Sequence, residues 1–134
     1  MKLSIITATF NSEGTLRRCL DSVAVQTALN NIEHLIIDGG SADETVGIAA
    51  EYPHIAYFAS QHDRGIYHAF NKGLAAATGD LLYFLNSDDY LYERTTVEEI
   101  IEQLSPGADF LCGRILVVNP MTGQTHVSPS KAAA

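Results

Sequence analysis

Residues 81–89 read LLYFLNSDD, a short apolar run followed by a polar turn that carries two adjacent carboxylates. A continuous apolar run of this length is typical of a strand buried in a parallel sheet. Side chains that follow such a strand lie at the carboxyl edge of the sheet, where open α/β sheets bind ligands. Two neighbouring carboxylates in a cleft repel each other unless a cation neutralises them. The stretch therefore predicts a buried strand that ends at a ligand site with a metal ion.

Strand and helix patterns alternate along the rest of the chain. Apolar runs predict strands over residues 3–8, 35–37, 55–59, 81–85, 110–112 and 114–118, a turn at 121–123 and a frayed end from 127 onward. Apolar spacing of three and four residues predicts four helices, which begin after Ser12, after Ser41, at Ile66 and after Thr96. Two of these starts match a capping box, Ser41 with Glu44 and Thr96 with Glu99. This alternation predicts a three-layer α/β/α fold around a mostly parallel sheet.

Composition limits the classes of function. A chain of 134 residues with 46% hydrophobic and 18% charged residues is expected to fold as one globular domain. Its net charge of −8 argues against a nucleic-acid partner, because phosphate-backbone binding needs clustered Lys and Arg. The sequence has no apolar run of membrane-spanning length and no leader pattern, so a cytoplasmic location is expected. Cys19 and Cys112 lack metal-ligand spacing and are interpreted as buried, reduced thiols.

Polar side chains follow three of the predicted strands. They are Thr9 with Phe10 and Asn11, then Asp38, and then Asp88 with Asp89. Because parallel strands end at the same edge of a sheet, these three segments are expected to meet at one rim. The Asp88–Asp89 pair taken alone could be a solvated turn, and residues 38–41 could be only a tight turn with a helix cap.

Several motifs, taken together and in order, resemble those of family 2 glycosyltransferases. They are TATFN at 7–11, IDGGS at 37–41, DRGIY at 63–67, NKG at 71–73, GD at 79–80 and NSDD at 86–89. The similarity runs from the first residue to about Val118 and is closest to bacterial enzymes that build surface polysaccharide. It implies a truncated, Rossmann-like nucleotide-diphospho-sugar transferase fold of the GT-A type.

The resemblance also implies roles for individual residues. It assigns Ala8, Thr9, Phe10, Asp38, Asp63 and Asp88 to the nucleotide, Arg64 and Lys72 to the diphosphate, and Asp89 to a divalent cation, Mn²⁺ or Mg²⁺. The implied donor is a nucleotide-diphospho-sugar, with a uridine diphosphate sugar favoured. The implied acceptor is a saccharide or a lipid-linked saccharide, and the full-length enzyme would lie in the cytoplasm or at the inner membrane face.

Two departures from the family pattern stand out. His68 replaces a carboxylate that the family segment usually carries. We find no general base, because every carboxylate placed at the rim is assigned to nucleotide or metal, so the catalytic residue is unknown. Residues 1–118 are therefore interpreted as a donor-binding domain, and residues 119–134 as a hairpin remnant with a disordered tail. An uncovered sheet edge would favour a homo-oligomer.

Other interpretations remain open. The chain could be a non-catalytic nucleotide-sugar binding module, or an inactive fragment without the acceptor half. An NAD-binding domain would need Gly-x-Gly-x-x-Gly after the first strand, where residues 9–14 read TFNSEG. A receiver-type phosphoacceptor domain would need a lysine late in the chain, and the only lysine there is Lys131, in the predicted frayed end. His62 and His68 lack a third partner for a metal site and are interpreted as surface or structural residues.

Overall fold

The computed structural model describes residues 1–104, 107–109 and 111–128. Contacts between residues divide the chain into two compact units, Met1–Ile101 and Glu102–Ala134. Among the described helices none is long and apolar enough to cross a membrane.

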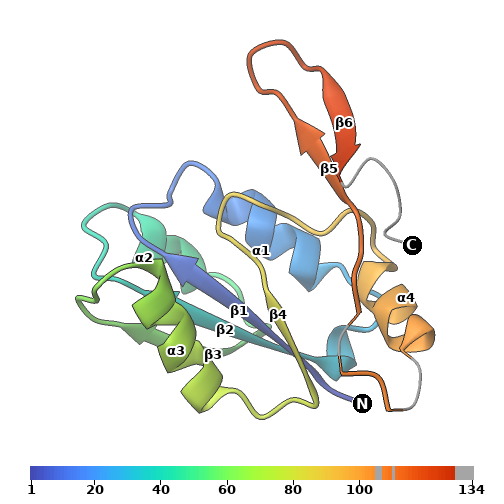
Figure 1. Ribbon diagram of the computed structural model, residues 1–134. Coiled ribbons are helices and arrows are strands. Elements are labelled where there is room, and N and C mark those ends of the chain that lie inside the picture. The colour runs from blue at the N-terminus through green and yellow to red at the C-terminus, as the bar shows by residue number, and fades with distance from the viewer. Residues whose placement is uncertain (105–106, 110, 129–134) are drawn as a thin grey trace. The chain divides into compact units, whose positions relative to one another are not determined.

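A parallel sheet organises the first unit (Figure 1). Its described strands are β1 (Leu3–Thr9), β2 (Ile32–Asp38), β3 (Ile55–Ser60) and β4 (Leu81–Phe84), in the spatial order β3-β2-β1-β4. Each neighbouring pair is parallel. Thr9 pairs with Asp38, which in turn pairs with Ser60, so three strands end level with one another. The prediction of a mostly parallel sheet is confirmed.

Helices cover both faces of this sheet. They are α1 (Leu16–Ala24), α2 (Thr45–Ala49), α3 (Ile66–Ala76) and α4 (Thr96–Gln103). Because side chains alternate along a strand, β1 sends Ile5 into a cluster with Cys19 of α1 and Val97 of α4, and Ile6 into a cluster with Ala69 of α3. Figure 1 shows α3 on one side of the sheet and α1 on the other. The predicted three layers are therefore present.

The packing of α3 depends on a glycine. A Cβ atom on Gly73 would overlap the side chain of Ile6 on β1. The absence of a side chain lets the helix lie close against the strand. This fixes the height of α3 over the sheet and, with it, the position of the segment that leads into the helix.

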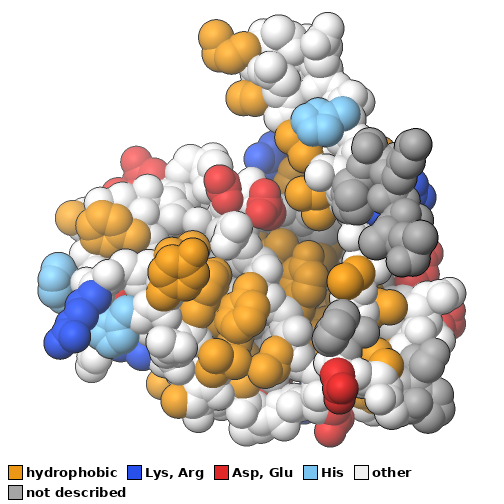
Figure 2. Space-filling view, viewed as in Figure 1, with side chains coloured by type: hydrophobic (Ala, Val, Ile, Leu, Met, Phe, Trp, Pro, Cys, Tyr) orange, Lys and Arg blue, Asp and Glu red, His pale blue; other side chains and the backbone are white. Residues whose placement is uncertain are grey.

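Strand β4 is less buried than its apolar run predicts. Leu82 and Phe84 are 50% and 43% exposed, because β4 lies at the end of the sheet and α3 packs mainly on β1 and β2. Phe84 packs against Phe70 of α3, with ring centroids 4.6 Å apart. Figure 2 shows hydrophobic side chains gathered on the face that carries α3 and β4. The interpretation of residues 81–85 as a fully buried strand is therefore wrong, although the strand itself is confirmed.

The predicted helix caps are wrong. Helix α1 begins at Leu16 with Thr15 as its N-cap, and α2 begins at Thr45 with Glu44 as its N-cap. The Ser12 hydroxyl lies 3.1 Å from the hydroxyl of Ser87, and the Ser41 hydroxyl accepts a hydrogen bond from the N–H of Asn11, so both contact other loops instead.

The last helix shows a similar displacement. Thr96 is the first residue of α4 and not its cap, and the hydroxyl of Thr95 donates to the carboxylate of Glu99. At the first two caps contacts with other loops compete with the local capping pattern, whereas at α4 the Thr96 hydroxyl accepts a hydrogen bond from the nearby N–H of Glu93.

The second unit contains a β-hairpin. Strand β5 (Ile115–Val118) pairs antiparallel with β6 (Thr125–Ser128), and Gly123 lies in the turn with φ of +72°. The predicted strand at 114–118 and the turn at 121–123 are confirmed. Residues 111 and 112 are not in a strand, and 127 and 128 belong to β6, so the predicted strand at 110–112 and fraying at 127 are wrong there. Residues 110 and 129–134 lie outside the described residues, and Cys112 is exposed, contrary to prediction.

Candidate functional site

A cavity of about 460 Å³ opens at the carboxyl edge of the sheet. Segments that follow all four strands of the first unit contribute to its wall. Its lining residues are Ala8, Thr9, Phe10, Ser12, Gly39, His62, Asp63, Gly65, Ile66, Ala69 and Ser87. The parallel sheet therefore brings distant parts of the sequence to one rim, as expected for a ligand site in an open α/β fold. Of the sequence-predicted residues, Ala8, Thr9, Phe10 and Asp63 line this cavity.

Asp38 lies behind the wall of the cavity. Its side chain is 1% exposed, and both carboxylate oxygens accept hydrogen bonds. Oδ1 accepts from the hydroxyls of Thr9 at 2.7 Å and Ser41 at 2.6 Å. Oδ2 accepts from the Ser60 hydroxyl at 2.8 Å and from the backbone N–H groups of Gly40 at 3.1 Å and Ser41 at 2.9 Å. Burial opposes ionisation, but these bonds outweigh it and lower the pKa of Asp38.

Asp63 presents the carboxylate that lies in the cavity. Its Oδ1 accepts a hydrogen bond from the N–H of Gly65 at 2.9 Å, and Oδ2 accepts none from the described residues. A Cβ atom on Gly39 would lie 3.0 Å from Asp63 Oδ2, so the carboxylate packs directly on the glycine backbone. Asp63 is thus held in place with one oxygen available to a ligand donor.

Two loops at the rim are fastened to each other by Asn11. This residue has φ of +48°, a left-handed conformation that asparagine tolerates better than most side chains. Its N–H donates to the Ser41 hydroxyl at 2.8 Å, and its side-chain oxygen accepts from the N–H of Ala42 at 2.9 Å. The loops after β1 and β2 therefore form one connected wall.

The acidic segment after β4 is fastened by its backbone and by Ser87, while its carboxylates stay exposed. The hydroxyls of Ser87 and Ser12 lie 3.1 Å apart, and the Cys19 thiol donates to the Asn86 carbonyl at 3.6 Å. Asp88 and Asp89 are exposed. Burial, with a smaller contribution from these two carboxylates, raises the pKa of Cys19 to about 12. The pair therefore projects from a fixed backbone beside the cavity.

The predicted diphosphate ligands do not line the cavity. Arg64 is exposed, and its backbone N–H donates to Nδ1 of His68 at 2.9 Å. Lys72 lies on α3, half-buried and two turns beyond the start of the helix. His68, at the position where the family pattern has a carboxylate, supports the loop before α3 in this way.

The residues fit a divalent cation only as a partial site. Within the described residues no three His, Cys, Asp or Glu side chains form a metal-binding group. Magnesium and manganese take hard oxygen ligands, and magnesium commonly uses one or two carboxylates together with substrate phosphates and waters. The exposed carboxylate of Asp89, whose described contact is a long bond of 3.5 Å from the Asn86 amide, matches such a site.

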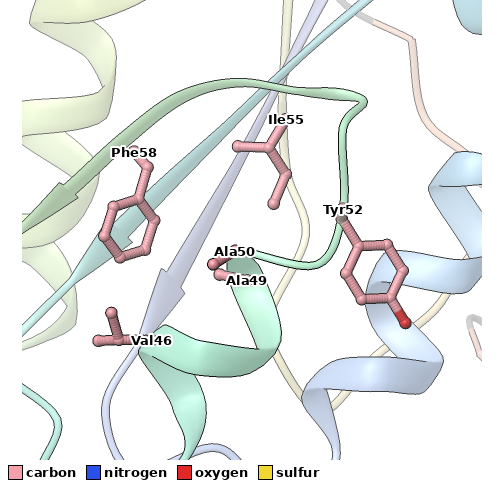
Figure 3. A pocket seen from close by; sticks show the side chains of 6 residues that line it. All are labelled: Val46, Ala49, Ala50, Tyr52, Ile55 and Phe58. Carbon is pink, nitrogen blue, oxygen red and sulfur yellow. The ribbon is translucent and has the colours of Figure 1, made fainter.

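A second cavity, of about 260 Å³, lies between α2 and β3 (Figure 3). Its side chains come from Val46, Ala49, Ala50, Tyr52, Ile55 and Phe58. They offer apolar surface and one phenol but no carboxylate, imidazole or thiol. This cavity provides no groups for catalysis or metal binding.

Sequence patterns missed several residues of the wall. Ser12 was expected to cap a helix, and Gly39 and Ser87 carry no chemical signal of their own. His62 lines the cavity and is exposed, which agrees with its interpretation as a surface residue. The Asp-Gly-Gly-Ser sequence did contain a usable signal, because a glycine beside a rim carboxylate permits close approach of another side chain.

Comparisons with known proteins agree with this geometry. A PGL/p-HBAD biosynthesis glycosyltransferase of Mycobacterium bovis is 43% identical over 101 residues, 72% of this chain and 39% of that protein. Staphylococcus aureus TarS residues 1–349, solved in complex with UDP-GlcNAc, superimposes with a TM-score of 0.69 at 28% identity, over 76% of this chain and 30% of that one. A Pyrobaculum calidifontis mannosyltransferase, solved with GDP-Man and Mn²⁺, has a TM-score of 0.74 at 22% identity, over 90% and 36% of the two chains, and shows the fold alone.

The chain spans 40% or less of the length of the first curated relatives it matches. The sheet order, the rim cavity and these solved neighbours identify the fold as GT-A. The model described as "Glycosyl transferase family 2" matches residues 4–131, almost the whole sequence. On this evidence the chain belongs to glycosyl transferase family 2.

Proposed function

We propose that this chain binds a nucleotide-diphospho-sugar, with a uridine diphosphate sugar favoured, as the donor-binding part of a glycosyltransferase. One observation carries the proposal: the rim cavity holds the carboxylate of Asp63 and adjoins the exposed Asp88–Asp89 pair. TarS, which resembles the chain at 28% identity, was solved with UDP-GlcNAc, and this supports the same class of donor here. The donor-binding role is assigned to residues 1–118.

The nucleoside is proposed to lie in the cavity beside the ends of β1 and β3. The ring of Phe10 is 63% exposed and offers an apolar surface to the base, next to Ala8 and Thr9. The free oxygen of Asp63 would accept a hydrogen bond from the base or the ribose, whose N–H and O–H groups are donors. Asp88 would accept from the ribose. The family resemblance implies the same contact for Asp38, which lies buried behind the wall of the cavity.

The diphosphate is proposed to lie toward the acidic segment. In a chain of net charge −8, a negatively charged donor needs a cation to approach two carboxylates. Asp89 would hold Mn²⁺ or Mg²⁺ with the diphosphate and waters as further ligands. When bound, the ion would supply Lewis-acid stabilisation of the charge on the departing nucleoside diphosphate. Arg64 and Lys72 would add positive charge at longer range.

Transfer to an acceptor needs a general base within hydrogen-bond reach of the acceptor hydroxyl. Asp63, Asp88 and Asp89 are assigned to the donor or the cation, and Asp38 is buried behind the wall of the cavity. We therefore assign the base, and recognition of a saccharide or lipid-linked saccharide in cell-surface polysaccharide synthesis, to the part of the relatives' length that this chain does not match. The mycobacterial relative is named a PGL/p-HBAD biosynthesis glycosyltransferase, and this name supports a biosynthetic role.

Calorimetric titration of the chain with uridine diphosphate, with and without Mn²⁺, tests the proposal. Binding is expected only with the metal, and Asp89→Ala should remove the metal-dependent part of the affinity. Asp80→Ala is the matched control, because the carboxylate of Asp80 accepts a bond from the N–H of Lys2 at the opposite edge of the sheet. Binding that is absent, or that does not depend on metal, would contradict the proposal.

A non-catalytic nucleotide-sugar binding module is the second candidate. It is favoured by the missing general base and by the limited share of the relatives that the chain matches. Incubation of the chain with UDP-GlcNAc and Mn²⁺, followed by chromatography of the products, separates the two. Release of uridine diphosphate would favour the enzyme, and stable binding without turnover would favour the module.

A further inference from the structure

We propose that Asp38 is a positioning residue of the donor cavity, which aligns the ends of β1 and β3 and the turn after β2 without touching the nucleotide. This inference rests on the proposed function and extends it. It replaces the contact with base or ribose that the family resemblance implies for this residue.

The first argument is the number of hydrogen bonds that the carboxylate of Asp38 can accept. An ionised carboxylate offers about four lone-pair sites for hydrogen-bond donors. Asp38 already accepts five hydrogen bonds from described residues, two on Oδ1 and three on Oδ2. With 1% of its surface exposed, it has neither a free acceptor site nor an open path to a ligand.

The second argument is the location of the groups that donate hydrogen bonds to Asp38. Thr9 lines the cavity itself, while Ser60 ends the strand that leads to His62 and Asp63. The N–H groups of Gly40 and Ser41 fix the turn whose first glycine supports Asp63. Two backbone hydrogen bonds join the same segments. The N–H of Gly39 donates to the carbonyl of Thr9 at 2.9 Å, and the N–H of Gln61 donates to the carbonyl of Asp38 at 3.0 Å.

These two arguments give Asp38 and Asp63 different roles at the cavity. Asp63 has an oxygen free of described donors and lines the cavity, whereas every bond of Asp38 goes to another part of the wall. Loss of the Asp38 carboxylate would release the Thr9 hydroxyl, the turn and the end of β3 together. Asp63 would then lose its fixed position over Gly39, and misplacement of about 1 Å at a binding group is enough for a large loss of function.

The test combines affinity with a spectroscopic signature. Asp38→Asn keeps the shape but replaces one acceptor oxygen by a donor, and Ser60→Ala removes one bond and is the milder variant. In the ¹⁵N-labelled chain without ligand, both should shift the amide resonances of Gly40, Ser41 and Asp63, and Asp38→Asn should speed hydrogen exchange at Gly40 and Ser41. Asp80→Asn, at the opposite edge, should shift none of them.

Affinity is measured with uridine diphosphate and guanosine diphosphate in the presence of Mg²⁺. Asp38→Asn should weaken both about tenfold or more, by equal factors, and Ser60→Ala should weaken both by a few fold. Unchanged affinity in Asp38→Asn, or a loss confined to uridine diphosphate, would overturn the inference while the proposed function stands. If the unmodified chain binds neither nucleotide, the proposed function fails, and the amide signature alone decides whether Asp38 orders the rim.

Discussion

The turn after β2 and the turn after β4 occupy the same rim but are built in opposite ways. In the first, Asp38 is buried and its oxygens are fully engaged by neighbouring loops. In the second, the backbone is fastened to α1 while the carboxylates of Asp88 and Asp89 remain exposed. The carboxylate of Asp38 is bonded to the rest of the rim, whereas the carboxylates of Asp88 and Asp89 are open to solvent.

This difference shows that residue type alone does not define a role at a shared edge. A carboxylate that accepts several hydrogen bonds is held ionised and rigid. A pair of exposed carboxylates gains stability mainly when a cation or a ligand donor arrives. Stability and ligand binding should therefore respond to different substitutions at the two turns.

Asp38→Ala should have the largest effect on stability. It leaves two buried or half-buried hydroxyls and two N–H groups without their acceptor, so the free energy of unfolding should fall by about 3–5 kcal/mol. Urea denaturation followed by circular dichroism measures this change. Asp80→Ala, which removes an exposed carboxylate at the other edge, should cost less than about 1 kcal/mol. Equal losses in the two variants would show that the Asp38 network adds no special stability.

Acid should destabilise the protein through a buried histidine on β2. His34 is fully buried on β2, with Nε2 2.9 Å from the Thr7 hydroxyl and Nδ1 3.0 Å from Nε2 of His54. Burial, with a smaller effect of His54, lowers the pKa of His34 to about 3. Between an ordinary pKa near 6.5 and that value the unfolded chain binds the extra proton, so stability should fall by about 1.4 kcal/mol per pH unit as pH decreases.

Urea titrations at pH 7, 6 and 5 measure this slope. Burial also lowers the pKa of His54, which adds to the slope in the same direction. His34→Gln should flatten the slope, and His126→Gln, on the exposed surface of β6, should not. A wild-type stability that does not change over this range would show that the histidine pair is solvated.

Gly39→Ala should separate binding from stability at the first turn. The new methyl group would lie 3.0 Å from Asp63 Oδ2, so the carboxylate must move, while the Asp38 network has no steric reason to change. Affinity for uridine diphosphate with Mn²⁺ should fall about tenfold, which corresponds to about 1.4 kcal/mol. Gly47→Ala is the control, since its methyl group would meet only Glu44 at an ordinary 3.5 Å. Unaltered affinity in Gly39→Ala would indicate that the carboxylate of Asp63 does not contact the donor.

Asp89→Ala should have the smallest effect on stability. The side chain is exposed and, among the residues that the structure describes, receives only the long bond from Asn86, so the free energy of unfolding should change by less than about 0.5 kcal/mol. Differential scanning calorimetry without metal measures it. A marked destabilisation would show that Asp89, in the turn after β4, stabilises the fold as Asp38 does after β2, and the two turns would then not differ in this respect.

Much of the fold could be predicted from the sequence because its strands are short apolar runs. The run that became β1 was found because the parallel sheet buries most of this strand, and the run that became β4 was found from its apolar residues although two of them are exposed. The start of β2 was missed because Glu33 and His34 interrupt the run; in the structure Ser4 donates to Glu33 and Thr7 bonds to His34. Such partners depend on β1 and are invisible to local periodicity.

The location of the site could be predicted from the sequence, but which of its carboxylates would be buried could not. The position of Asp38, at the end of β2, follows from the parallel sheet. Its burial does not, because the donors come from Thr9 and Ser60, which are distant in sequence. The misplaced caps after β1 and β2 have the same cause: the Ser12 hydroxyl contacts Ser87, and the Ser41 hydroxyl accepts from the N–H of Asn11, so both bond across the rim.

The contact between Gly39 and Asp63 has a consequence for the history of the family. A Cβ atom at position 39 would lie 3.0 Å from Asp63 Oδ2, so a side chain on the turn after β2 would crowd the one supplied by the loop after β3. Homologues that carry an acidic residue in place of Gly39 should therefore carry a smaller residue, or a rerouted loop, in place of Asp63. An alignment should show these two positions covarying, as alternative evolutionary routes to one negative charge.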